Sequence, residues 1–246
     1  MATPPDDSEH PLGEAMVHWQ GASPPPRDPI DGRRVRIEAL DADVHGSALY
    51  RTLAKEGALW TYLAAGPFAS ERDWRDWLDA VMTRDDGLYH ALLDADSREA
   101  LGIAAYLRIE PAHGAIEIGN IVYSQRLQRT RPGTEAMYLF MARAFDELGY
   151  RRYEWKCNAL NAASRSAAER LGFRYEGTFR QARVDKGRNR DTAWYSIIDS
   201  EWPALRRAYA MWLDDDNFDA EGRQKASLRQ LIDVARSTPA PAQDSE

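Results

Sequence analysis

The chain has 246 residues, a formal net charge of −7, 43% hydrophobic residues and a single cysteine. This length accommodates one large domain with tails, and one cysteine excludes an internal disulfide framework and suits a reducing cytoplasm. No apolar run approaches the roughly 18 residues of a membrane span, so no membrane partner is expected, and the acidic, proline-containing start is not expected to be a signal peptide. The negative charge argues against nucleic acid as the main partner.

In chain order, residues 1–29 come first and hold seven of the 13 prolines. They predict a tail without regular structure, in which Trp19 is expected to dock as an anchor. Residues 30–212 are predicted to form the domain, 213–236 a C-terminal helical extension, and 237–246 a second disordered tail.

Alternating apolar and polar residues over 33–39 predict the first strand of the domain. A helix from 43 to about 55 and a second helix capped by Ser70 follow. Residues 88–93 and 101–109 predict a hairpin, and 115–123 a further strand. The later elements are expected to be helix 134–148, strand 152–158, helix 161–171, strands 173–184 and 192–199, and helices 202–212 and 222–236. This order predicts an α/β protein with antiparallel hairpins.

Residues 128–135, Gln-Arg-Thr-Arg-Pro-Gly-Thr-Glu, connect the strand at 115–123 to a strongly amphipathic helix. A strand that turns directly into a helix leaves unpaired backbone N–H groups at the positive end of the helix dipole, which predicts a phosphate site. Pro132 lacks an N–H group, but in the first turn of a helix that donor would not be used. A second segment, 158–177, contains Asn158, Asn161, Ser164 and the Leu-Gly-Phe sequence that ends at 173.

Together these two segments resemble the acetyl-CoA-dependent N-acetyltransferases of the GNAT superfamily, and most closely the RimJ/RimL-like branch of ribosomal-protein N-terminal acetyltransferases. In that family the pyrophosphate loop reads Arg/Gln-x-x-Gly-x-Gly/Ala. Gln128 and Gly133 match its first and last fixed positions, whereas Arg131 stands where the middle glycine is usual. The resemblance covers about residues 30–212 and implies a mixed, mostly antiparallel twisted sheet flanked by helices, with a V-shaped split between its two central strands.

The resemblance also implies acetyl-CoA as cosubstrate, bound in the split between strands 115–123 and 152–158. Its pyrophosphate is expected on the loop and the helix start, its pantetheine arm on two asparagines, and the oxyanion of the reaction on backbone N–H groups at a strand end. The expected contacts are Gln128, Arg129, Thr130, Arg131, Gly133 and Thr134 for the pyrophosphate, Asn158 and Asn161 for pantetheine, and Val122 and Tyr123 for the oxyanion. Asn161 is equally suited to be a helix N-cap.

Acetyl transfer to an amine needs a base for the amine, a donor for the oxyanion and a partner for the departing thiolate. Glu117 is the candidate base, because a carboxylate between two isoleucines of a strand is costly unless it is paired or lines a cleft. The alternative is a structural, salt-bridged carboxylate. The resemblance implies that Ser164 stabilises the thiolate, with an ordinary first-turn serine as the alternative and Tyr175 and Tyr195 as other candidate acids.

The histidines show no metal-ligand spacing, so no metal is expected. A basic cluster surrounds the last predicted hairpin, formed by Arg180, Arg183, Lys186, Arg188 and Arg190. A solvated turn is the simpler interpretation, and contact with an acidic substrate or a partner subunit, as in a homodimer, is the alternative. The sequence leaves two acceptors open, a protein N-terminal amine or a small-molecule amine. A rival function is a non-catalytic acyl-CoA-binding or interaction module, which Arg131 in place of glycine keeps open.

Overall fold

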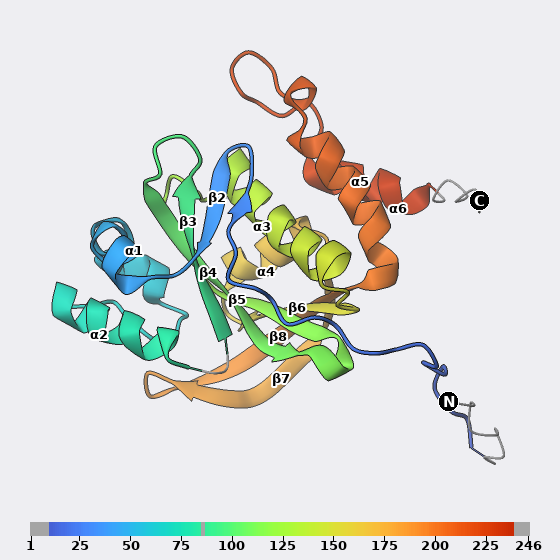
Figure 1. The fold of residues 1–246 in the computed structure, drawn as a ribbon, viewed down its shortest axis with the longest axis horizontal. Helices are drawn as coiled ribbons and strands as arrows, with labels where there is room; N and C mark the ends of the chain where they lie inside the picture. Colours follow the sequence, from blue (N-terminus) through green and yellow to red (C-terminus); the bar gives the residue numbers. More distant parts are fainter. Residues whose placement is uncertain (1–9, 85–86, 239–246) are drawn as a thin grey trace.

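The centre of the molecule is one eight-stranded sheet with the order β1-β2-β3-β4-β5-β6-β8-β7 (Figure 1). The computed structural model describes residues 10–84 and 87–238; the ends of both predicted tails, 1–9 and 239–246, lie outside these residues. All neighbouring strands are antiparallel except the pair β5–β6. The predicted mixed, mostly antiparallel sheet is therefore confirmed.

Seven of the eight strands follow the predicted ones closely, and the short β1 was not predicted. The strands are β1 (Ile30–Asp31), β2 (Val35–Ala39), β3 (Gly87–Asp94), β4 (Ala100–Glu110), β5 (Ala115–Tyr123), β6 (Arg152–Asn158), β7 (Arg174–Asp185) and β8 (Arg188–Ile198). The last hairpin is longer than predicted, since β8 begins at Arg188 and the turn shortens to two residues.

Helices cover both faces of this sheet. They are α1 (Ala42–Leu49), continued by the π-helical turn η1 (Tyr50–Ala54), α2 (Glu71–Met82), α3 (Arg131–Ala142), continued by η4 (Arg143–Glu147), α4 (Ala162–Arg170), α5 (Trp202–Leu213) and α6 (Leu228–Ser237). Side chains of α1 and α2 form one core with β3 and β4. Side chains of α3 to α6 form a second, larger core on the opposite face.

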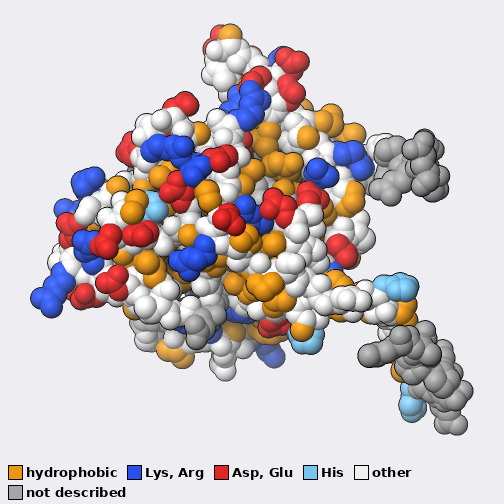
Figure 2. Space-filling view, in the orientation of Figure 1, with side chains coloured by type: hydrophobic (Ala, Val, Ile, Leu, Met, Phe, Trp, Pro, Cys, Tyr) orange, Lys and Arg blue, Asp and Glu red, His pale blue; other side chains and the backbone are white. Residues whose placement is uncertain are grey.

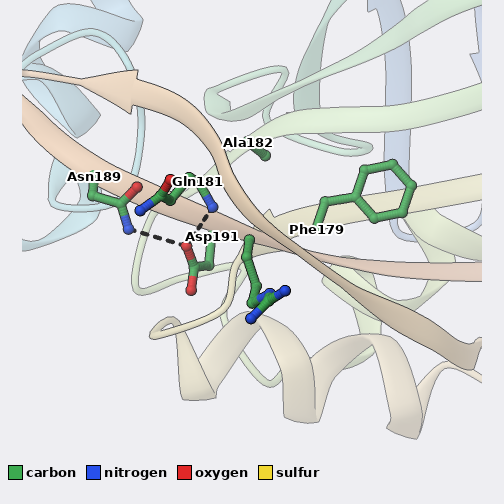
Figure 3. Close-up of a pocket in the computed structure, with 6 residues that line it drawn as sticks. Phe179, Gln181, Ala182, Asn189 and Asp191 are labelled. Carbon is green, nitrogen blue, oxygen red and sulfur yellow. Dashed lines mark hydrogen bonds between the residues drawn. The ribbon is translucent and has the colours of Figure 1, made fainter.

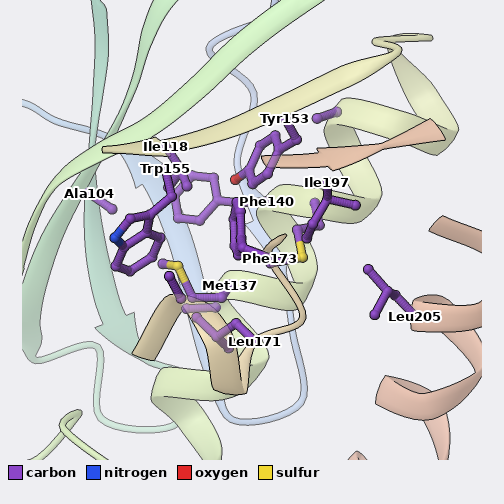
Figure 4. Close-up of a cluster of buried hydrophobic side chains, with 14 of the residues drawn as sticks. Ala104, Ile118, Met137, Phe140, Tyr153, Trp155, Leu171, Phe173, Ile197 and Leu205 are labelled. Atoms are coloured by element: carbon purple, nitrogen blue, oxygen red, sulfur yellow. The ribbon is translucent and has the colours of Figure 1, made fainter. Parts of the chain in front are cut away.

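The larger core shows to which face of the sheet each side chain of β5 and β6 points. Phe140 of α3 and Tyr153 of β6 lie together in it, beside Trp155 and Ile118 (Figure 4). Since successive side chains of a strand point to opposite faces, the residues between these buried ones face the α1–α2 side. This places Glu117 on the α1–α2 face of the sheet.

Helix starts follow their capping residues. As predicted, Ser70 caps α2, in a capping box with Asp73. The helix predicted from 134 begins three residues earlier, because the Thr130 side chain caps it and accepts from Gly133 N–H. The helix predicted from 222 begins only at Leu228, where Ser227 forms a capping box with Gln230.

The N-terminal segment is held against the domain by Trp19. Its indole N–H donates to Ala112 O at 2.8 Å, and its ring lies so close to Gly114 that a Cβ there would be 2.5 Å from it. The predicted anchor is therefore present.

Candidate active site

The central feature of the site is the separation of β5 from β6. The two strands pair in parallel over three positions only, from Ala115↔Arg152 to Glu117↔Glu154. Beyond them a pocket of about 970 Å³ opens between the strands. Its walls come from α3 and α4 on one face of the sheet and from residues 58–65 and Trp77 on the other. The pocket therefore passes through the sheet from face to face.

At the α3 end, the loop after β5 forms a close-fitting backbone cradle. A Cβ on Gly133 would lie 2.2 Å from Leu127 O, so the chain passes here too closely for any other residue. Arg129 adopts a positive φ of 61°, and the Gln128 side chain donates to Tyr123 O at 2.7 Å, which ties the loop to the end of β5. Five residues of the predicted pyrophosphate loop line the pocket: Gln128, Arg129, Thr130, Gly133 and Thr134.

The backbone donors of this loop are fewer than expected. Thr134 N–H bonds to Thr130 O at 3.1 Å and is already used, whereas the bonds of Thr130 N–H to Leu127 O and of Gly133 N–H to Thr130 Oγ1 are long, at 3.4 and 3.3 Å. Within the part of the chain that the structure describes, the N–H groups of Arg129 and Arg131 form no hydrogen bond. These donors at the start of α3 suit an anion.

The side chain of Arg131 does not line the pocket. The guanidinium donates to Leu213 O at 3.1 Å and to Asp215 Oδ1 at 2.6 Å, and its Cζ lies 3.8 Å from the centre of the Phe218 ring. Arg131 and Arg33 hold the pKa of Asp215 at about 2. The side chain is thus directed at the C-terminal segment, and only the backbone N–H of Arg131 remains at the loop.

Two asparagines stand in the pocket wall at the end of β6. Asn158 Oδ1 accepts from Leu160 N–H at 2.9 Å, and Asn161 Oδ1 accepts from Ser164 N–H at 3.1 Å as the N-cap of α4. Both line the pocket. Because each uses its carbonyl oxygen locally, each amide NH₂ group remains for a ligand.

The two predicted oxyanion donors point in different directions. Ser124 N–H donates to Leu101 O at 3.0 Å, and Val122 pairs with Ile103 in the same register. In an antiparallel ladder bonded and non-bonded pairs alternate, so Val122 N–H bonds to β4 whereas Tyr123 N–H points to the open edge of β5. This register favours Tyr123 N–H over Val122 N–H as the oxyanion donor, and both residues line the pocket.

Glu117 lies at the point where the strands separate and is 4% exposed. Its Oε2 is 3.0 Å from Lys156 Nζ and 3.3 Å from Arg108 Nε. Burial raises the pKa of Glu117 above its usual value, and the two cations oppose that shift. The carboxylate is therefore both ion-paired and part of the pocket lining.

Ser164 faces the pocket from the first turn of α4. Its Oγ accepts from Trp155 Nε1 at 3.0 Å, and the hydroxyl also forms a hydrogen bond with the Cys157 thiol. The alternative acids lie elsewhere: Tyr195 OH accepts from Arg165 Nε at 3.1 Å, and Tyr175 is about half exposed beside Thr178. Neither tyrosine lines the pocket.

Comparison with known proteins places this geometry in a family. A model of the acetyltransferase (GNAT) domain matches residues 34–174, more than half of the chain. The chain belongs to the GNAT acetyltransferase family. It is accordingly an acyltransferase, and the V-shaped split between β5 and β6 is the feature that the family resemblance implied.

Solved GNAT structures are similar over most of the chain. A GCN5-related N-acetyltransferase from Brucella melitensis has 47% identity and a TM-score of 0.85, covering 88% of this chain and 99% of its own. A probable GNAT-family acetyltransferase from Chromobacterium violaceum has 43% identity and a TM-score of 0.75, covering 82% and 100%. A RimL ribosomal alpha-N-protein acetyltransferase in complex with coenzyme A has 24% identity and a TM-score of 0.60, covering 70% and 99%, which shows a shared fold alone. No protein of curated function matches the chain.

Several residues of this GNAT pocket were not predicted as site residues. Lys156 and Arg108 contact Glu117, and Arg183 and Arg190 reach the pocket from the last hairpin, for which a solvated turn was the simpler interpretation. The alternation of Lys156 with the buried Trp155 and Cys157 was the one available signal in the sequence.

Two further findings concern the part of the chain that the structure describes. No helix there is both long and apolar enough to cross a bilayer. Nor do three or more His, Cys, Asp or Glu side chains gather there in a way that could hold a metal ion.

Proposed function

We propose that this protein transfers the acetyl group of acetyl-CoA to a primary amine by direct attack in a ternary complex within the β5–β6 pocket. The observation that carries the proposal is the pocket itself, which has a phosphate cradle at Gly133 on one side and a buried carboxylate, Glu117, on the other. The acceptor is a protein N-terminal amine, as in the RimJ/RimL-like branch, or a small-molecule amine. A buried free thiol, Cys157, suits a reducing cytoplasm.

The residues present fit acetyl-CoA. The loop at Gly133 has no room for a Cβ and lies at a helix N-terminus, which suits the binding of the pyrophosphate. The outward N–H of Tyr123 and the amide groups of Asn158 and Asn161 suit the pantetheine arm and the carbonyl oxygen that gains charge. The side chain of Arg131 pairs with Asp215 and leaves this cradle clear, which supports acetyl-CoA binding there.

Acetyl-CoA supplies an acetyl group activated as a thioester. Glu117, directly or through a water, takes the proton of the attacking amine, and Lys156 and Arg108 keep the carboxylate charged for this step. As the nitrogen–carbon bond forms and the carbon–sulfur bond breaks, the Ser164 hydroxyl turns its hydrogen from Cys157 to the departing thiolate, a stronger acceptor than a neutral thiol.

The test is the isosteric variant Glu117→Gln. It should lower kcat about 10²-fold, the lower end for a lost general base, and leave acetyl-CoA affinity unchanged. Glu154→Gln is the matched control, because Glu154 also pairs with Lys156 but does not line the pocket. Unchanged turnover in Glu117→Gln would make Glu117 structural and require another proton relay.

A further inference from the structure

The charge of the pocket differs from the charge of the protein. Seven cationic side chains line it: Arg84, Arg108, Arg129, Lys156, Arg170, Arg183 and Arg190. Among the described lining residues Glu117 is the sole carboxylate. The whole chain carries a net charge of −7, and acidic and basic side chains are interspersed on the face that Figure 2 displays. The basic character is therefore concentrated in this pocket.

Two of the seven cations belong to the phosphate end. Arg129 is part of the loop after β5, and Arg170 of α4 donates to Thr134 Oγ1 at 3.2 Å. Both lie on the α3–α4 side, where the phosphates of acetyl-CoA are proposed to bind. The phosphates thus do not account for the other five cations.

The remaining cations lie on the α1–α2 side with Glu117. Lys156 Nζ is 3.8 Å from the centre of the Trp194 ring, so these two side chains share this face. Arg190 alternates with the buried Ala193 and Tyr195 along β8 and therefore also points to this face. Arg183 pairs directly with Arg190 across the hairpin. The acceptor must reach Glu117 through this basic side of the pocket.

The β7–β8 hairpin is built to hold these arginines over the pocket. A bulge in β7 is fixed by Asp191, which accepts from Gln181 N–H at 2.7 Å and from Asn189 Nδ2 at 3.0 Å (Figure 3). Beyond the bulge, Lys186 at the tip donates to Trp60 O at 2.8 Å. The hairpin is thereby attached to the segment that forms the opposite wall.

The arginines are only partly neutralised. Asp185 accepts from Arg190 at 2.8 Å and lies 3.4 Å from Arg183 Nε. One carboxylate thus serves two guanidinium groups, and Arg190 Nε is buried without a hydrogen-bond partner. An anionic ligand would complete this arrangement, since guanidinium groups favour paired contacts with carboxylate or phosphate.

We propose that the acceptor is an amine that also carries an acidic group, which Arg183 and Arg190 bind while the amine faces Glu117. This inference rests on the proposed function and specifies the substrate class of the same pocket. Electrostatic complementarity of this kind governs selectivity among acceptors more than the rate of the chemical step.

The test compares acceptors that differ only in charge. The panel contains peptides with Asp or Glu after the N-terminal residue against the same peptides with Asn or Gln, and free amino acids against their amides. Wild-type protein should favour the acidic member of each pair by at least about 10-fold in kcat/KM. Preference within the peptide pairs identifies a protein N-terminus, and preference within the amino-acid pairs a small molecule; either supports the inference.

Substitutions in the β7–β8 hairpin test whether its arginines cause the preference for acidic acceptors. Arg183→Gln and Arg190→Gln should raise KM for acidic acceptors about 10-fold, so that the preference for acidic over neutral acceptors is lost. The matched control is Arg188→Gln, which makes the same change on the same hairpin outside the pocket and should behave as wild type. Equal kcat/KM for charged and neutral acceptors in wild-type protein would overturn the inference and leave the proposed function standing. Absence of transfer to every amine would overturn both.

Discussion

Gly133 offers a quantitative test of the phosphate cradle. In Gly133→Ala the new Cβ would lie 2.2 Å from Leu127 O and 3.1 Å from Tyr123 Cε2. Real Cβ contacts are essentially never closer than 3.0 Å, so the loop and the start of α3 must separate by about 0.8 Å. Leu127 O cannot yield easily, because it already accepts from Thr130 Oγ1 at 2.8 Å. A displacement of this size would move the backbone N–H groups of the loop and the helix start out of alignment with a bound phosphate.

We therefore expect Gly133→Ala to weaken acetyl-CoA binding at least about 10-fold, given that a misplacement near 1 Å costs up to about 10²-fold. Overpacking should also lower the free energy of unfolding by about 1–3 kcal/mol. Isothermal titration with acetyl-CoA and urea unfolding measure the two effects.

The matched control is Gly46→Ala within α1, where the new Cβ would lie 3.4 Å from Leu78 Cδ1. It should keep acetyl-CoA affinity and gain up to about 1 kcal/mol of stability from helix propensity. Wild-type affinity in folded Gly133→Ala would refute the placement of the phosphate cradle.

Two further predictions concern charged contacts of the site. Lys156→Met removes a cation that lowers the pKa of Glu117, so this pKa should rise and the fall of kcat toward acidic pH should begin at a higher pH. Lys156→Arg should restore the wild-type pH profile of kcat. An unchanged pH profile in Lys156→Met would show that Lys156 does not influence the catalytic base. In Asp215→Asn the Arg131 side chain at the start of α3 loses its ion-pair partner, and acetyl-CoA binding should weaken about 2- to 5-fold with kcat unchanged. The expected effect is modest because this ion pair is exposed. The control Asp216→Asn should leave the affinity as in wild type, and an equal loss in both variants would contradict a specific role of Asp215.

The sequence predicted most of the fold because its signals are local. Ser70 caps α2 and Asn161 caps α4 within one turn of their partners, and alternation over 115–123 marks β5 without knowledge of its neighbours. The start of α3 was misplaced because Thr130 and Thr134 are both suitable caps, and the choice depends on how the loop closes under Leu127.

The parts of the site that lie within the family motif were predicted from the sequence. The parts that depend on contacts between segments distant in the sequence were not. Arg131 turns away from the loop because Leu213 and Asp215, more than 80 positions along the chain, fold back beside it. Val122 and Tyr123 differ in direction because of the register with β4, which includes a bulge near Asn120. No local pattern in the sequence specifies these contacts.

The basic side of the pocket depends in the same way on tertiary structure. Lys156 meets Glu117 because β5 and β6 pair at Glu117↔Glu154, and Arg190 reaches the pocket because the hairpin bends toward Trp60. In the sequence the hairpin arginines are equally typical of a solvated turn. Their placement at the pocket is a property of the folded chain.

The central claim is direct transfer from acetyl-CoA to an amine in this pocket, and the most direct measurement follows both products in wild-type protein. The account predicts that CoA and acetylated amine form in equal amounts, only when both substrates are present, with initial-rate lines that intersect as in a ternary complex. Binding of acetyl-CoA without CoA release for any amine in the panel would contradict it and favour a non-catalytic module. Parallel lines, typical of a ping-pong reaction through an acetylated enzyme, would contradict direct attack.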